Sequence, residues 1–156
     1  MAERAERARV LFLCTGNSCR SQMAEGWAGA MHGPRVEACS AGTKPTPTGA
    51  IDPCAVRVMR EAGVNISAQR SKSVAEAIGS DAARPIDLVV TVCDSAAEAC
   101  PVFAGARRTV HAPFDDPPRL AAGETDDERA LAHYRRVRDE IRAFVADLMK
   151  HIPPTH

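Results

Sequence analysis

An apolar run that leads directly into a loop with a cysteine and an arginine constrains this chain more than any other feature. Val10–Leu13 is short and unbroken, as is typical of a strand buried on both faces of a parallel sheet. The polar segment Cys14–Ser21 follows at once. A helix is expected next, because apolar residues recur on one helical face: Met23, Ala24, Trp27, Ala28 and Met31. The sequence therefore predicts a strand, a tight loop and a helix in direct succession.

Other apolar segments predict three more strands separated by helices. The strands are expected at Arg35–Cys39, Leu88–Val92 and Arg107–His111. Between them, Asp52 as N-cap and a glycine at position 63 bracket one helix. An apolar stripe over residues 131–148 predicts a long C-terminal helix. This alternation favours an α/β fold, a single domain with a four-stranded parallel sheet flanked by helices.

The bulk composition limits the class of partner. The chain has 156 residues and is 45% hydrophobic, so we expect one domain over residues 1–156, with flexible ends at 1–8 and 151–156. Lysine plus arginine and aspartate plus glutamate both number 20, which favours neither nucleic acid nor an anionic membrane. No apolar run approaches the roughly 18 to 20 residues that span a bilayer. We expect a soluble, cytoplasmic protein that binds no nucleic acid and no membrane.

The six cysteines are too sparse for a secreted disulfide scaffold. In a reducing cytoplasm, such thiols are more often catalytic or metal-binding than structural. Their positions must therefore decide their roles.

The loop after the first strand has the residues that bind and attack a tetrahedral oxyanion. Cys14 and Arg20 lie six positions apart, and backbone N–H groups at a helix start point at an anion. Gly16 permits a tight backbone, and the planar fork of Arg20 suits two anion oxygens. The same positive environment is expected to lower the pKa of the Cys14 thiol. Cys14 is therefore the predicted nucleophile and Arg20 the anion clamp.

The whole loop is expected to contact the substrate. The predicted binding residues are Thr15, Gly16, Asn17, Ser18, Cys19, Arg20 and Ser21. Asn17 is expected to brace the loop through its amide, and Ser21 to donate a hydrogen bond to the Cys14 thiolate. A nucleotide phosphate loop is excluded, because the motif lacks the glycine-lysine-serine or -threonine ending.

These residues resemble the motif of the low-molecular-weight protein-tyrosine phosphatases and of the arsenate reductases that share their fold. The block Cys14–Trp27 looks like the reductase branch, because Gln22 stands where the phosphatase branch typically has proline. Ser18 likewise stands where that branch has an aliphatic residue. The segment Ser40–Gly42 matches both branches.

An acid is expected in the loop after the fourth strand. Phe114, Asp115, Asp116 and Pro117 lie there, on the same rim as the nucleophile if the strands are parallel. The resemblance implies that Asp116, directly before the proline, is the catalytic acid. Alone, this string would more often form only a turn.

Two further cysteines distinguish a reductase from a phosphatase. The resemblance implies that Cys93 attacks the Cys14 sulfur, that Cys100 then attacks Cys93, and that thioredoxin reduces the final disulfide. Without the loop, two packed core cysteines would be an equal interpretation. Capping-box spacing of Ser95 and Glu98 predicts a short helix that unwinds when the Cys93–Cys100 disulfide forms.

Some related reductases hold a cation beside the loop. In this chain Arg70 and Lys72 occupy the downstream ligand positions, so we expect the Lys72 ammonium to replace the cation next to Asn17 and Glu25. No metal and no bound cofactor are therefore expected. Thioredoxin is the expected external reductant, and a glutathione-type thiol remains an alternative.

Two other functions stay open at this stage. A protein-tyrosine phosphatase needs the same nucleophile and acid but also aromatic walls, and Pro118 and Arg119 follow the acid loop instead. A structural zinc or arsenite-binding site would use four thiols, with spacings looser than those of common zinc knuckles: Cys14, Cys19, Cys93 and Cys100.

Overall fold

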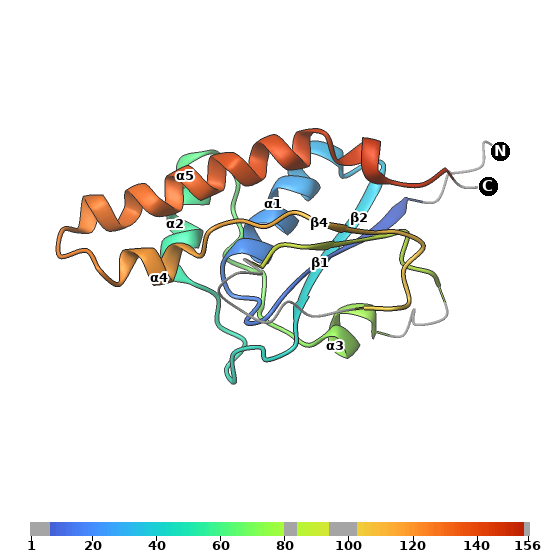
Figure 1. Cartoon of the computed structure of the whole chain (residues 1–156), viewed down its shortest axis with the longest axis horizontal. Coiled ribbons are helices and arrows are strands. Elements are labelled where there is room, and N and C mark those ends of the chain that lie inside the picture. The colour runs from blue at the N-terminus through green and yellow to red at the C-terminus, as the bar shows by residue number, and fades with distance from the viewer. Residues whose placement is uncertain (1–6, 80–83, 94–102, 155–156) are drawn as a thin grey trace.

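The computed structural model describes residues 7–79, 84–93 and 103–154 and has a parallel sheet at its centre (Figure 1). The strands are β1 (Ala8–Cys14), β2 (Val36–Gly42), β3 (Leu88–Thr91) and β4 (Thr109–His111). They lie in the order β2-β1-β3-β4, and every pairing is parallel. The predicted four-stranded parallel sheet is confirmed.

Three helices cover one face of the sheet. Helix α1 (Arg20–His32) and helix α2 (Pro53–Glu61) both pack against the long α5 (Asp127–Ala146), as Figure 1 shows. Their apolar faces meet the buried residues Val10 and Phe12 in the larger core cluster. A smaller cluster lies on the other face, where α3 (Val74–Ile78) packs against β2. Helices thus lie on both faces of the sheet, as predicted. They bury the two apolar faces that a parallel sheet has.

Several boundaries differ from the prediction. Strand β2 continues three residues beyond the expected end to Gly42, and β4 begins two residues later than expected, at Thr109. The C-terminal stripe belongs to two elements, α5 and the 3₁₀ helix Leu148–His151. Strand ends are decided by ladder partners rather than by local hydrophobicity, which explains these shifts.

Two short helices were missed. Helix α3 begins with a capping box in which Ser73 and Glu76 exchange hydrogen bonds, a signal that was present in the sequence. Helix α4 (Pro117–Ala121) begins directly after Asp116, where the sequence predicts only the loop that follows the fourth strand. Pro117 at its first position is a standard helix start, because proline lacks the N–H that would be unsatisfied there.

The parallel arrangement places the chemistry at one edge. Cys14 ends β1, Cys93 follows β3, and the loop with Asp116 follows β4, so all three lie at the carboxyl ends of neighbouring strands. Within the described part of the chain, no helix is both long and apolar enough to cross a membrane.

Candidate active site

The loop from Cys14 to Arg20 is held in a conformation that only a few residues tolerate. Asn17 has φ of 50°, the one positive value outside glycine among the described residues. Asparagine enters this left-handed region more readily than most side chains. The end of β2 lies close against the loop, since a Cβ on Gly42 would lie 2.4 Å from the Thr15 carbonyl oxygen. Gly42 is therefore required by close backbone approach.

Two hydrogen bonds hold the Cys14 sulfur. The Asn17 N–H donates to Sγ at 3.2 Å, and Ser21 Oγ lies 3.0 Å from Sγ. Asn17 Nδ2 donates to Ser21 Oγ at 2.8 Å, which leaves the hydroxyl hydrogen to point at the sulfur. The bracing role predicted for Asn17 and the hydrogen bond predicted for Ser21 are both present.

The pKa of the Cys14 thiol differs from the prediction. Burial raises it above its ordinary value, while the Ser21 hydroxyl, the Asn17 N–H and the Arg20 guanidinium act to lower it. Cys14 is 3% exposed, and the desolvation of its thiol outweighs these hydrogen bonds and the Arg20 charge. The expected net lowering was wrong because local sequence indicates the donors but not the depth of burial.

Cys19 is unsuited to act as a nucleophile. It is buried, and burial raises the pKa of its thiol well above the ordinary value, with the negative charges of Asp52 and Asp116 adding to the effect. Cys19 therefore stays a neutral thiol that forms part of the cavity wall.

Arg20 lies between the loop and the acid segment. Its Nη1 donates to the Phe114 carbonyl oxygen at 3.1 Å, and its Nη2 lies 3.5 Å from Asp116 Oδ1. The Arg20 side chain is 6% exposed, so its charge is weakly screened by solvent. The structure thus brings the predicted clamp and the predicted acid together. The neighbouring Asp115 instead pairs with Arg136 on α5 at 2.9 Å.

The predicted residues enclose a small cavity. Its volume is about 210 Å³, and its lining combines Cys14, Arg20 and Asp116 with loop residues and Pro118. Among the described residues, no aromatic side chain lines it. Thr15 and Ser21 are absent from this lining; Ser21 acts through the Cys14 sulfur instead.

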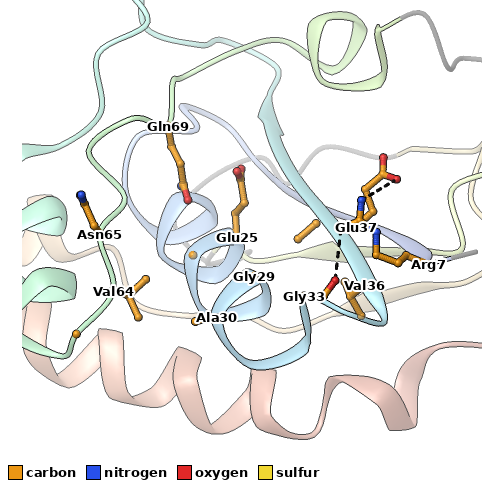
Figure 2. A pocket seen from close by; sticks show the side chains of 13 residues that line it. Arg7, Glu25, Gly29, Ala30, Gly33, Val36, Glu37, Val64, Asn65 and Gln69 are labelled. Carbon is orange, nitrogen blue, oxygen red and sulfur yellow. Dashed lines mark hydrogen bonds and ion pairs between the residues drawn. The ribbon is translucent and has the colours of Figure 1, made fainter.

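A larger cavity of about 670 Å³ lies between α1, β2 and the segment 63–69 (Figure 2). Glu25, Gly29, Val36 and Gln69 are among its lining residues, and none of the predicted catalytic residues in the described chain lines it. We therefore assign the active site to the smaller cavity, because it contains the predicted nucleophile Cys14.

Only one of the two relay cysteines lies in the described chain. Cys93 is fully buried and belongs to the same core cluster as Cys14. The strands that precede them are paired, with Leu13 opposite Thr91. Cys100 and the predicted helix over residues 93–101 lie outside the described residues, apart from Cys93 itself.

The predicted lysine stands beside the loop. Lys72 Nζ lies 3.6 Å from Glu25 Oε1, and the Lys72 N–H donates to Asn17 Oδ1 at 3.0 Å. Ser40 Oγ donates to the same Glu25 oxygen at 2.6 Å. Within the described residues, no group of three or more potential metal-binding side chains is present.

Tyr134 was expected only as part of the core stripe of the last helix. Its hydroxyl donates to Asp52 Oδ2 at 2.7 Å, and the Asp52 N–H donates to the Ser18 carbonyl oxygen at 2.8 Å. Burial and the Asp52 carboxylate raise the pKa of Tyr134, which keeps the hydroxyl protonated as a donor. Helix α5 is thereby tied to the loop, a link with no local sequence signal.

The fold and the loop together define a class of enzyme that has a cysteine and an arginine in the loop after the first parallel strand. The model of the low molecular weight phosphotyrosine protein phosphatase family matches residues 9–155. The chain therefore belongs to this family.

Several proteins that are similar to this chain in sequence or structure are arsenate reductases. The chain is 45% identical over 132 residues to an arsenate reductase from Halalkalibacterium halodurans, covering 85% of this chain and 88% of that protein. It resembles the solved structure of an arsenate reductase in the phosphate binding state, with a TM-score of 0.72, 28% identity and coverage of 94% and 99%. A thioredoxin-dependent arsenate reductase from Corynebacterium glutamicum has a TM-score of 0.63 and 25% identity, over 94% of this chain and 61% of that one.

Proposed function

We propose that this protein reduces arsenate to arsenite, with Cys14 as the nucleophile. Cys93 and Cys100 relay the resulting disulfide, which thioredoxin finally reduces. The observation that carries the proposal is the small cavity in which Cys14, Arg20 and Asp116 converge. A volume of about 210 Å³ with no aromatic lining among the described residues suits a small inorganic oxyanion. The named relatives support the same substrate.

In the first step the Cys14 thiolate attacks arsenic. An S–As bond forms, and one arsenate oxygen leaves as water after it receives a proton from Asp116. The Arg20 guanidinium neutralises the anion oxygens, and the Asn17 and Ser21 hydrogen bonds hold the sulfur in place. Burial of the thiol makes these donors necessary, because they oppose the rise in its pKa.

In the second step the Cys93 thiolate attacks Cys14 Sγ. The S–As bond breaks, its electron pair stays with arsenic, and arsenite leaves while a Cys14–Cys93 disulfide forms. Cys100 then attacks Cys93 Sγ, which releases the Cys14 thiolate and leaves a Cys93–Cys100 disulfide. The shared core cluster of Cys14 and Cys93 supports the first exchange.

The final disulfide needs an external dithiol, and thioredoxin supplies two electrons by the same exchange chemistry. The thioredoxin-dependent relative from Corynebacterium glutamicum supports this partner. A reducing compartment is required for a thiol cycle of this kind, so the cytoplasm is the proposed location. No resident metal or cofactor takes part in the proposed steps.

The proposal is tested by arsenate-dependent NADPH oxidation in the presence of thioredoxin and thioredoxin reductase, beside hydrolysis of para-nitrophenyl phosphate. We expect sustained arsenate turnover and only slow ester hydrolysis. Cys14→Ser should abolish both activities. The matched control Cys54→Ser, which removes a half-buried thiol of α2, should keep both. Dominant ester hydrolysis without arsenate-dependent oxidation would instead identify a phosphatase.

A further inference from the structure

The peptide groups of the loop are held from outside by a continuous set of hydrogen bonds. Five consecutive carbonyl oxygens, from Cys14 to Ser18, each accept a hydrogen bond from a residue outside the loop 14–20. The donors, in chain order of the acceptors, are Thr43 N, Lys44 N, Ser71 Oγ, Gln22 Nε2 and Asp52 N. These five donors come from four separate segments of the chain.

This pattern decides where the N–H groups point. In a trans peptide the N–H of one residue points away from the carbonyl of the residue before it. Carbonyls held outward therefore aim the following N–H groups into the loop. The Gly16 carbonyl accepts from Ser71 at 2.9 Å, and the next N–H, that of Asn17, points inward to Cys14 Sγ at 3.2 Å.

Two of the five donors are side chains, and both are buried. Gln22 is fully buried, and its Nε2 donates to the Asn17 carbonyl at 3.0 Å and to the Arg70 carbonyl at 2.8 Å. Both amide hydrogens are thus used, and one of them holds the peptide that follows the strained φ of Asn17. Backbone donors would survive most substitutions, whereas this contact depends on the side chain.

A second amide fixes the orientation of the first. Gln69 Nε2 donates to Gln22 Oε1 at 2.8 Å and to the Gln22 carbonyl at 3.0 Å. Figure 2 shows the Gln69 side chain extending from the segment 63–69 toward α1, beside Glu25. Since Gln69 binds the oxygen end of the Gln22 amide, the nitrogen end faces the loop.

Ser71 has the corresponding role one peptide earlier. Ser71 is 4% exposed, its Oγ donates to the Gly16 carbonyl, and the same oxygen accepts the Thr46 N–H at 2.9 Å. The accepted hydrogen bond leaves the hydroxyl hydrogen to serve Gly16 alone.

We propose that Gln22 and Ser71 are positioning residues of the anion loop. They hold the Gly16 and Asn17 carbonyls outward, so that the Asn17 N–H is aimed at the Cys14 sulfur and the Ser18 N–H is aimed into the loop before a tetrahedral oxyanion binds. Gln69 supports this role by orienting Gln22. The inference rests on the proposed function only in taking this loop as the oxyanion site. Neither residue touches the reacting atoms.

The experiment measures inorganic phosphate binding by calorimetry and the pH dependence of Cys14 alkylation by iodoacetamide. Ser71→Ala and Gln22→Met should each weaken phosphate binding about tenfold, the effect of losing one well-placed hydrogen bond. Ser71→Ala should also move the alkylation profile to higher pH, because the Asn17 N–H no longer holds the sulfur. Ser71→Thr, which keeps the hydroxyl, should bind phosphate better than Ser71→Ala.

Thermal unfolding of each variant shows whether a loss of phosphate binding reflects lost positioning or lost stability. The matched control Ser67→Ala changes an exposed serine of the same segment and should leave phosphate binding and alkylation unchanged. Folded Ser71→Ala and Gln22→Met proteins with wild-type phosphate affinity would overturn the positioning role, even if both melted at lower temperature. Absence of phosphate binding by the wild-type protein would instead overturn the oxyanion site itself.

Discussion

The ammonium of Lys72 lies 3.6 Å from Glu25 Oε1, and both residues are about four-fifths buried at their side chains, with 22% and 19% exposed. The Lys72 backbone N–H also donates to Asn17 Oδ1, so the ion pair is tied directly to the loop. Lys72→Met would remove the positive charge and leave the Glu25 carboxylate beside the loop. We expect a loss of about 1 kcal/mol in the free energy of unfolding.

Potassium should partly replace the missing ammonium in Lys72→Met. At constant ionic strength, exchanging a bulky organic cation for potassium should raise the melting temperature of this variant by about 2–4 °C and leave the wild type unchanged. Lys44→Met, which removes an exposed lysine, serves as the control. If potassium changed the melting temperatures of Lys72→Met and wild type equally, the idea that the Lys72 ammonium takes the place of a cation would be contradicted.

Arg20→Lys should impair anion binding and turnover together. A lysine ammonium is a point charge and cannot present two N–H groups to two oxygens, nor keep both contacts to Phe114 and Asp116. We expect arsenate kcat/KM to fall about 100-fold, which corresponds to about 2.7 kcal/mol of transition-state stabilisation. Arg60→Lys, at an exposed position of α2, is the control and should behave as wild type. A wild-type phosphate Kd in Arg20→Lys would count against the clamp.

Ser21→Ala should raise the pKa of Cys14 further. The Ser21 hydroxyl lies 3.0 Å from Cys14 Sγ and lowers the pKa, in opposition to burial. Its loss destabilises the thiolate, so a higher pH is needed to form the same thiolate fraction. The iodoacetamide rate profile should therefore move toward alkaline pH. Alkylation of Cys14→Ser measures the background from the other cysteines, and an unmoved profile would show that the hydroxyl does not act on the sulfur.

Cys100→Ser should stop recycling and spare the first turnover. The Cys14–Cys93 disulfide forms without Cys100, so each enzyme molecule should release one arsenite and then stop. Peptide mapping under non-reducing conditions should recover Cys14 linked to Cys93. Cys39→Ser, at a half-buried cysteine of β2, should keep full turnover. Continued thioredoxin-driven turnover by Cys100→Ser would refute the relay.

The sequence by itself determined the features that depend on neighbours along the chain. The apolar run before Cys14, the glycine at position 16 and the amphipathic face after Arg20 are local, and the β1–loop–α1 unit agrees with them. The bracketing of α2 by Asp52 and Gly63 is equally local, and the structure confirms it. Each pattern spans only a few residues and reflects intrinsic backbone and side-chain preferences, so no tertiary information was needed.

Only the tertiary structure decided how the loop is supported and how deeply its nucleophile is buried. Ser71 contacts Gly16 across 55 positions, and Tyr134 contacts Asp52 across 82. No periodicity or motif encodes such pairs, because they exist only once β2, α5 and the segment 69–72 converge on the end of β1. The raised pKa of Cys14 has the same origin: the hydrogen-bond donors are local in sequence, but the desolvation that outweighs them comes from the packed fold.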